Sequence, residues 1–264
     1  MWKGGDDKGW ELDFSPEKER REEKRIQGLL SGRRCIVKTG TIINVGGNVF
    51  TMAEPVDAVR AIHNAFRIDM KQIDAAAFEA ARGKDGLAGT LERYRFFNEI
   101  LAWHARGEEL AIFPALEGVA PLVAEAYEKD HRGLDTAFEE LNASYAAGDA
   151  LKTARAAAAF RFHLNIHLGK EDTHLYRIFR ERIPIPEQGK ALGIMSSTVP
   201  KERFPEVIAW MFPLIGNDDR ENMTRIWQMV MPAPVFASVK GLIKNSLGSD
   251  WAELTRRIPA LQAD

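Results

Sequence analysis

All six histidines of this chain fall within one stretch of 112 residues, and two of them begin an H-x3-E pair. His104 and Glu108 form the first pair, and His167 and Glu171 form the second. In an α-helix, residues four apart lie about 40° from each other, so each pair points in one direction. Imidazole and carboxylate groups without a thiolate suit iron, manganese or zinc. The spacing therefore indicates a metal site built on helices.

Two further histidines lie on apolar stripes. His63 lies between Val59 and Phe66, and His131 between Tyr127 and Leu134. Polar groups on such faces are expensive to bury without partners, and a metal ion satisfies several of them together. The predicted ligands are His63, His104, Glu108, His131, His167 and Glu171. Because each carboxylate can bridge, two metals are the natural count, with room for an oxo or hydroxo bridge and a small exogenous molecule.

Four long helices must position these side chains. Apolar stripes and the Gly, Pro and Asp boundaries predict helices over about 55–82, 87–113, 121–148 and 149–183. The second helix is expected to stop at Pro114, and Asp149 is expected to cap the fourth. Short connections between long amphipathic helices make antiparallel neighbours, so we expect an all-α, up-down-up-down four-helix bundle.

The flanking regions differ from this bundle, which we place at residues 55–184. Residues 1–54 form an N-terminal extension with a charged helix from about Ser15-Pro16 through Glu17–Arg25 and a β-branched stretch over 35–51 that resembles a small hairpin. Residues 185–264 predict a C-terminal helical subdomain with shorter helices at about 201–215, 218–231, 234–246 and 249–257. The expected fold class is therefore an all-α bundle with additional C-terminal helices.

Composition excludes several classes of protein. The net charge is −2, whereas duplex binding normally needs a basic surplus, so no nucleic-acid partner is expected. The single cysteine, Cys35, excludes a disulfide framework and a cysteine-ligated zinc or iron–sulfur site. The charged N-terminus lacks an apolar signal segment, and no apolar run is long enough to span a membrane. We expect a cytoplasmic protein with no membrane contact.

The full pattern resembles the hemerythrin-like HHE cation-binding domain. H…H-x3-E…H…H-x3-E extends over four helices, with EEL-AIFPAL after the second histidine and HLGKED-x2-LY around the last pair, over about residues 55–184. The resemblance implies two iron ions inside a four-helix bundle. Carried over by position, His63 and His104 hold one iron, His131 and His167 hold the other, and Glu108 and Glu171 bridge them.

Several residues depart from the oxygen-carrying hemerythrins or surround the predicted site. Those carriers have a second histidine where this chain has Asp135, and they end with H-x4-D, which His167 and Asp172 also satisfy. We favour Glu171 over Asp172, since it repeats the spacing of the first pair. Alternative ligands or residues beside the ligands are Tyr127, Asp135, His163, Asp172 and His174.

A ferritin-like carboxylate site is the rival metal hypothesis. It uses E-x-x-H motifs, and this chain has Glu128-x2-His131 and Glu171-x2-His174. In that fold these motifs alternate with helices that contribute a lone glutamate, whereas here they fall on consecutive helices. The ferritin-like hypothesis also leaves His63, His104 and His167 without a role.

Three functions fit a di-iron centre in an apolar bundle. The first is binding or sensing of O2, NO or peroxide in a stress response. The second is an enzyme, either a di-iron oxidase, a peroxide-consuming protein or a nitric-oxide-stress repair protein; whether the chain is an enzyme stays open. The third is an iron-responsive interaction module that contacts a protein partner through residues 185–264.

Overall fold

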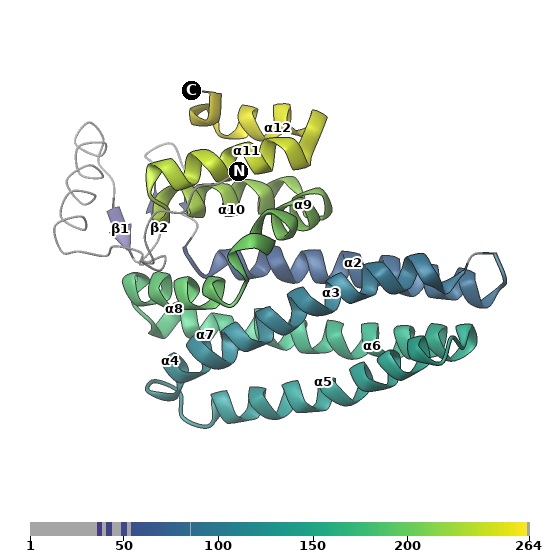
Figure 1. Ribbon diagram of the computed structural model, residues 1–264. Coiled ribbons are helices and arrows are strands. Elements are labelled where there is room, and N and C mark those ends of the chain that lie inside the picture. The colour runs from purple at the N-terminus through teal and green to yellow at the C-terminus, as the bar shows by residue number, and fades with distance from the viewer. Residues whose placement is uncertain (1–35, 39–40, 44–48, 52–53, 85, 263–264) are drawn as a thin grey trace.

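The computed structural model describes residues 36–38, 41–43, 49–51, 54–84 and 86–262. Four long helices dominate it: α2 (Asp57–Ala81), α3 (Leu87–Gly107), α5 (Val123–Ala146) and α6 (Ala150–Lys170). They run side by side in alternating directions, with α2 against α6 and α6 against α5 as the main contacts (Figure 1). The predicted all-α bundle with extra C-terminal helices is confirmed.

The connections follow the expected local chemistry, with one exception. Asp149 caps α6, because its carboxylate accepts a hydrogen bond from the backbone N–H of Lys152 at 3.0 Å, and Gly148 before it has φ +65°. The prediction that the second helix stops at Pro114 is wrong. Pro114 lies in the first turn of α4 (Phe113–Glu117), where a proline is tolerated.

Two of the long helices continue through a π-helical turn. Helix α3 passes into η1 (Glu108–Ile112) and then α4, and α6 passes into η2 (Glu171–Leu175) and then α7 (Tyr176–Arg182). A π turn inserts one residue into a helix and is frequent at functional sites. In an α-helix, a proline normally clashes with the carbonyl of the residue four positions before it. For Pro114, that position falls within the π turn η1.

Further helices follow the bundle: α8 (Ile185–Ser197), α9 (Phe204–Leu214), α10 (Asn217–Val230), α11 (Ala233–Leu247) and α12 (Trp251–Arg257). Short 3-10 turns lie at Lys201–Arg203 (η3), Gly248–Asp250 (η4) and Pro259–Gln262 (η5). Helices α9 and α10 pack on α2, and α8 packs on α3 and η1. The sequence did not predict α8, which begins with a proline in its first turn. Along the described residues, no helix has the length and apolar character needed to cross a membrane.

Three short strands precede the bundle: β1 (Ile36–Lys38), β2 (Thr41–Ile43) and β3 (Val49–Thr51). They pair antiparallel in the order β1-β2-β3, with Ile36 opposite Ile43 and Ile42 opposite Phe50. The strands fall in the range for which the sequence suggests a hairpin. The predicted charged helix at Glu17–Arg25 lies outside the described residues, and the division of the chain into three domains stays a prediction.

The bundle contains two separate apolar cores, one toward each end. The first core includes Phe66, Phe97, Leu141 and Phe160. The second is built from the start of α2, the start of α5 and the segments beyond the π turns, and includes Val59, Phe113, Leu116, Tyr127 and Phe179. The predicted ligand residues lie between these two cores.

Candidate metal centre

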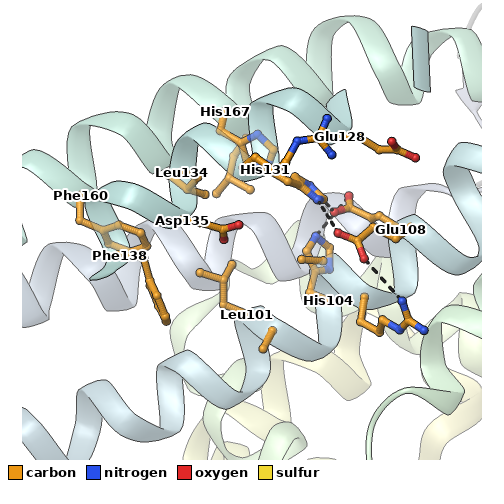
Figure 2. Close-up of a pocket in the computed structure, with 16 residues that line it drawn as sticks. Leu101, His104, Glu108, Glu128, His131, Leu134, Asp135, Phe138, Phe160 and His167 are labelled. Atoms are coloured by element: carbon orange, nitrogen blue, oxygen red, sulfur yellow. Dashed lines mark hydrogen bonds and ion pairs between the residues drawn. The ribbon is translucent and has the colours of Figure 1, made fainter. Parts of the chain in front are cut away.

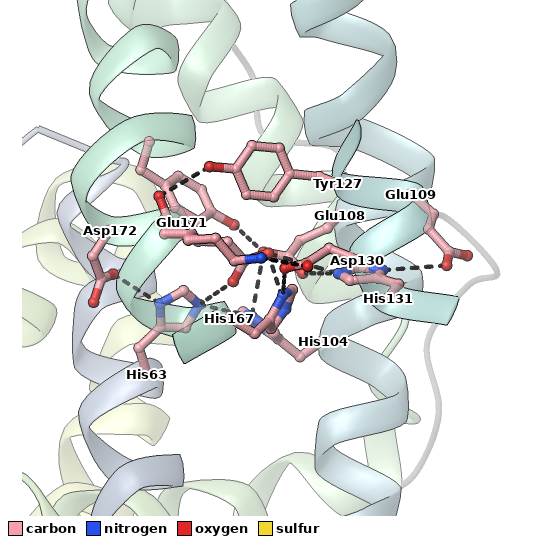
Figure 3. Close-up of polar contacts among 12 residues, drawn as sticks. His63, His104, Glu108, Glu109, Tyr127, Asp130, His131, His167, Glu171 and Asp172 are labelled. Atoms are coloured by element: carbon pink, nitrogen blue, oxygen red, sulfur yellow. Dashed lines mark hydrogen bonds and ion pairs between the residues drawn. The ribbon is translucent and has the colours of Figure 1, made fainter. Parts of the chain in front are cut away.

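All six predicted ligand residues meet in the middle of the bundle (Figure 3). One group of donor atoms comes from His63, His104, Glu108 and Glu171, and a second comes from His131, His167 and Glu171; within each group the atoms lie within 4.8 Å of one another. His63 comes from α2, His104 from α3, His131 from α5 and His167 from α6, so each long helix contributes one imidazole.

Each glutamate directs one oxygen toward each histidine pair. Glu108 places Oε1 3.4 Å from Nε2 of His104 and Oε2 3.4 Å from Nε2 of His131. Glu171 places Oε2 3.6 Å from Nε2 of His63 and Oε1 3.2 Å from Nε2 of His167. Two carboxylates that each span two nitrogen pairs have the arrangement required to bridge two cations.

Burial and unsatisfied polar atoms indicate that this cluster fits a cation. His63, Glu108 and Glu171 are fully buried. Among the described residues, Oε2 of Glu108, both carboxylate oxygens of Glu171 and Nε2 of His131 are buried without a hydrogen-bond partner. Each such atom costs about 1–3 kcal/mol if nothing satisfies it. Nitrogen and oxygen donors without sulfur suit iron, manganese or zinc, so the residues present fit such ions.

The electrostatics of the cluster show strong coupling between the two carboxyl groups. Burial raises the pKa of Glu171 well above its usual value, and the charge of Glu108 adds to the rise. Burial alone would also raise the pKa of Glu108, but the imidazoles of His104 and His131 hold it well below its usual value. Two adjacent buried carboxyl groups do not both ionise readily, so the metal-free cluster favours a charged Glu108 beside a neutral Glu171.

The pKa values of His131 and His167 shift in opposite directions. Burial lowers the pKa of His131, but the nearby carboxyl groups of Glu108 and Glu171, 3.4 and 3.6 Å from its Nε2, outweigh it and raise this pKa to about 10. Burial lowers the pKa of His167 to about 4, against the opposing effect of Asp130. His131 therefore holds a proton in the metal-free cluster, and a cation must displace that proton before binding Nε2.

Carboxylates outside the cluster fix the orientation of three histidines through the ring nitrogen that faces away. Asp172 lies 2.8 Å from Nδ1 of His63, and Asp130 lies 2.9 Å from Nδ1 of His167. Glu109 approaches Nδ1 of His131 at 3.5 Å. Such contacts set the tautomer, so that the nitrogen facing the cluster is free to bind a metal.

The choice between Glu171 and Asp172 is visible in this geometry. Glu171 faces three imidazoles of the cluster, whereas Asp172 lies behind His63 and accepts a hydrogen bond from Nη2 of Arg67 at 2.6 Å. Asp172 is therefore placed to orient His63, and Glu171 is placed to contact a cation.

The π turns position both glutamates, since Glu108 and Glu171 are the first residues of η1 and η2. A π turn pairs residues five apart, so Glu108 shares a face with Phe113 and Glu171 shares one with Tyr176. The Phe113 ring lies 5.2 Å from that of His131, and the Tyr176 hydroxyl donates a hydrogen bond to Oε1 of Glu108 at 2.5 Å. These two rings close the cluster on the side of the second core.

Four residues considered in the sequence lie outside the cluster. The Tyr127 hydroxyl donates to the carbonyl of Lys170 at 3.0 Å and lies 3.2 Å from Nδ1 of His174. Asp135, His163 and His174 are exposed. Glu128 is exposed as well, so the structure does not gather the ligands that a ferritin-like site requires, and that hypothesis is wrong.

Sequence reasoning missed Tyr176, Asp130, Glu109 and Arg67 as neighbours of the site. Tyr176 is the final residue of the HLGKED-x2-LY segment, which was a signal for it. Sequence spacing did not indicate Asp130 and Glu109, because each is adjacent in sequence to a predicted ligand, and adjacent residues of an α-helix point about 100° apart.

The fold and the site together define a four-helix bundle with an interior cation site made of histidine and glutamate. Residues 54–179 match the model of the hemerythrin HHE cation binding domain. This segment of the chain is therefore a hemerythrin HHE cation-binding domain.

Curated relatives share the same region at low identity. The chain is 25% identical over 177 residues to the zinc finger protein BRUTUS of Arabidopsis thaliana, covering 64% of this chain and 14% of that protein. Two BRUTUS-like zinc finger proteins of the same plant are 21% and 22% identical over 211 and 210 residues, covering 73% and 69% of this chain. The chain thus spans 14–17% of the length of these relatives. No solved structure matches it significantly.

Proposed function

We propose that this domain binds two iron ions and that the resulting centre binds or reacts with O2, NO or peroxide. The observation that carries the proposal is the pair of buried glutamates, each with one oxygen toward each histidine pair. In this proposal His63 and His104 hold one ion, His131 and His167 hold the other, and Glu108 and Glu171 bridge them. When bound, the iron pair supplies redox chemistry toward a small ligand.

The surrounding residues have defined roles in the proposal. Asp172 and Asp130 hold His63 and His167 in the tautomer that presents Nε2 to the cluster. The Tyr176 O–H holds a proton against Glu108 Oε1 and keeps that oxygen in place. The Phe66 and Phe113 rings lie 5.3 Å from His104 and 5.2 Å from His131 and cover those two sides of the cluster with apolar surface.

Reaction is favoured over reversible storage because the second side has one nitrogen ligand fewer than in the oxygen-carrying hemerythrins. Those carriers have a second histidine where this chain has Asp135, which is exposed and lies outside the cluster, so the second side keeps only His131 and His167. The missing nitrogen leaves a position for solvent, NO or peroxide. We expect air to oxidise the reduced, iron-loaded protein irreversibly and NO to bind it; an oxygen adduct that reverses under argon would instead identify an oxygen binder.

Metal analysis with a matched control tests the site. Protein loaded with iron under argon should contain about two irons per chain and show visible absorption after exposure to air. The His104→Ala and Glu108→Ala variants should lose iron, whereas His163→Ala should retain it, because His163 is exposed and lies outside the cluster. Unchanged iron content in the first two variants, or a single zinc without visible absorption, would overturn the proposal.

A second candidate function, a metal-responsive interaction module, is favoured by the contact of α8 with the metal-binding helix. The Thr198 hydroxyl donates to the carbonyl of Trp103 at 2.8 Å, directly before His104. A Cβ on Gly107 would lie 2.5 Å from Cγ of Met195, so α8 packs closely beside Glu108. Iron loading should then alter hydrogen exchange in α8; unchanged exchange there would contradict this function.

A further inference from the structure

A pocket of about 490 Å³ opens from the protein surface onto the cluster and is lined by residues of α3, α5 and α6 (Figure 2). Its wall includes His104, Glu108, His131 and His167. Helix α3 packs only sparsely against α5, which leaves this space open.

The cluster is accessible from this side. His104, His131 and His167 line the pocket and retain 6%, 7% and 6% exposure, whereas His63 and Glu171 do not line it and are fully buried. Oε2 of Glu108 and Nε2 of His131 have no partner among the described residues. A molecule in the pocket therefore lies against the His104–His131 side of the cluster.

The pocket is much larger than a diatomic ligand requires. A water molecule takes about 30 Å³ of liquid volume, and O2 and NO are of similar size. Pockets of about 300–1,000 Å³ are typical for organic ligands. The size of this pocket therefore points to an organic molecule.

The pocket has an apolar inner part and a charged mouth. Leu101, Leu134, Phe138, Phe160 and Leu168 form the apolar part, and they are buried or half-buried. At the exposed mouth, Arg106 pairs with Glu109 at 3.7 Å. The other exposed charged residues of the lining are Glu128, Asp135 and Arg132, two negative charges against one positive, which leaves the mouth with a negative excess. Such a mouth attracts a neutral or positively charged group and disfavours an anion.

We propose that this pocket binds a small organic molecule with an apolar body and a neutral or cationic end. The apolar body packs against Leu134 and Phe138, and the polar end lies near Glu128 and Asp135. Binding itself does not require metal. If this molecule also acts at the metal centre, beside O2, NO or peroxide, that role rests on the proposed function.

Two phenylalkyl probes of similar size and opposite charge test the proposal: phenethylamine and 3-phenylpropionate, titrated by calorimetry into metal-free and zinc-loaded protein. We expect phenethylamine to bind and phenylpropionate to bind about five- to tenfold more weakly. Leu134→Trp should fill the pocket and abolish phenethylamine binding. Leu151→Trp is the matched control, because Leu151 is exposed on α6 away from the pocket, and it should bind as the unaltered protein does.

A second variant keeps the test decisive if Leu134→Trp fails to fold. Asp135→Lys changes one exposed charge at the mouth and should reverse the preference between the two probes. Absence of phenethylamine binding, tighter binding of phenylpropionate, or unchanged preference in Asp135→Lys would overturn the proposal. Iron analysis of a further portion of the same protein, loaded with iron under argon, separates the two claims, since phenethylamine binding with no iron uptake would defeat the metal centre alone.

Discussion

Glu171 and Asp172 are adjacent in sequence, but the structure gives them different roles that two conservative substitutions separate. Both oxygens of Glu171 are buried without a partner among the described residues, and they face His63, His131 and His167. Both oxygens of Asp172 are engaged, one by His63 and the other by Arg67, and its side chain is 23% exposed. Glu171→Gln and Asp172→Asn each remove one charge at nearly constant volume.

The two substitutions should affect different quantities: Asp172→Asn the metal affinity, and Glu171→Gln the number of bound ions. Loss of a carboxylate that orients a ligand typically lowers metal affinity about 10–100-fold, or about 1.4–2.7 kcal/mol, so Asp172→Asn should still bind the same number of ions. Glu171→Gln removes the proposed ligand shared by both histidine pairs and should lose at least one ion. Because burial and Glu108 raise the pKa of Glu171, its neutral form is already favoured without metal, and glutamine resembles that form. The metal-free fold should therefore survive the change.

Iron content after anaerobic loading gives the number of ions, and competition with a coloured chelator gives the affinity. Thermal unfolding of the metal-free variants shows whether each still folds. Equal loss of ions in the two variants would refute the reasoning. Loss of an ion in Asp172→Asn with full loading of Glu171→Gln would make Asp172 the ligand.

Three other outcomes follow from the site. Tyr176→Phe should keep both ions but shift the visible spectrum, because Oε1 of Glu108 loses its hydrogen bond; an unchanged spectrum would contradict that contact. Metal affinity should rise at least tenfold per pH unit between pH 6 and 8, because cations displace the His131 proton, whose pKa is raised to about 10, and the proton that burial and Glu108 keep on Glu171; chelator competition at pH 6, 7 and 8 measures this slope, and a flat profile would oppose it. Gly107→Ala should destabilise the fold by about 1–3 kcal/mol in denaturant unfolding, and Met195→Ala should relieve part of that loss. Full additivity of those two changes would exclude a steric clash.

Sequence periodicity predicts the bundle and the inward direction of the ligand residues. The stripes around His63 and His131, and the H-x3-E spacing around His104 and His167, depend only on 3.6 residues per turn, and the structure brings those side chains together. Asp149 as a helix cap depends on equally local chemistry. The metal roles of these residues stay a prediction.

Sequence periodicity does not predict the π turns or the contacts that depend on them. In a continuous α-helix, Tyr176 would lie about 140° from Glu171, so the 3.6-residue period places it away from the cluster. The extra residue in each turn is set by the packing of the whole bundle rather than by a local residue preference. The sequence did not predict helix α8 because Pro184 and Pro186 are residues that usually end a helix. Pro186 instead lies in the first turn of α8, where proline is tolerated.

The two π turns also mean that the bundle is built in two angular registers. Side chains of α3 and α6 point inward in one phase up to Glu108 and Glu171, and those of α4 and α7 point inward in a phase shifted by one residue. Deleting one residue of Glu109–Ile112 would convert the π turn into an α turn, in which Phe113 would follow Glu108 by four residues and stay on the same face. Phe113 and Leu116 would then remain in the second core. One extra residue in each turn therefore accounts for the whole phase shift, and the candidate metal centre lies where the two registers meet.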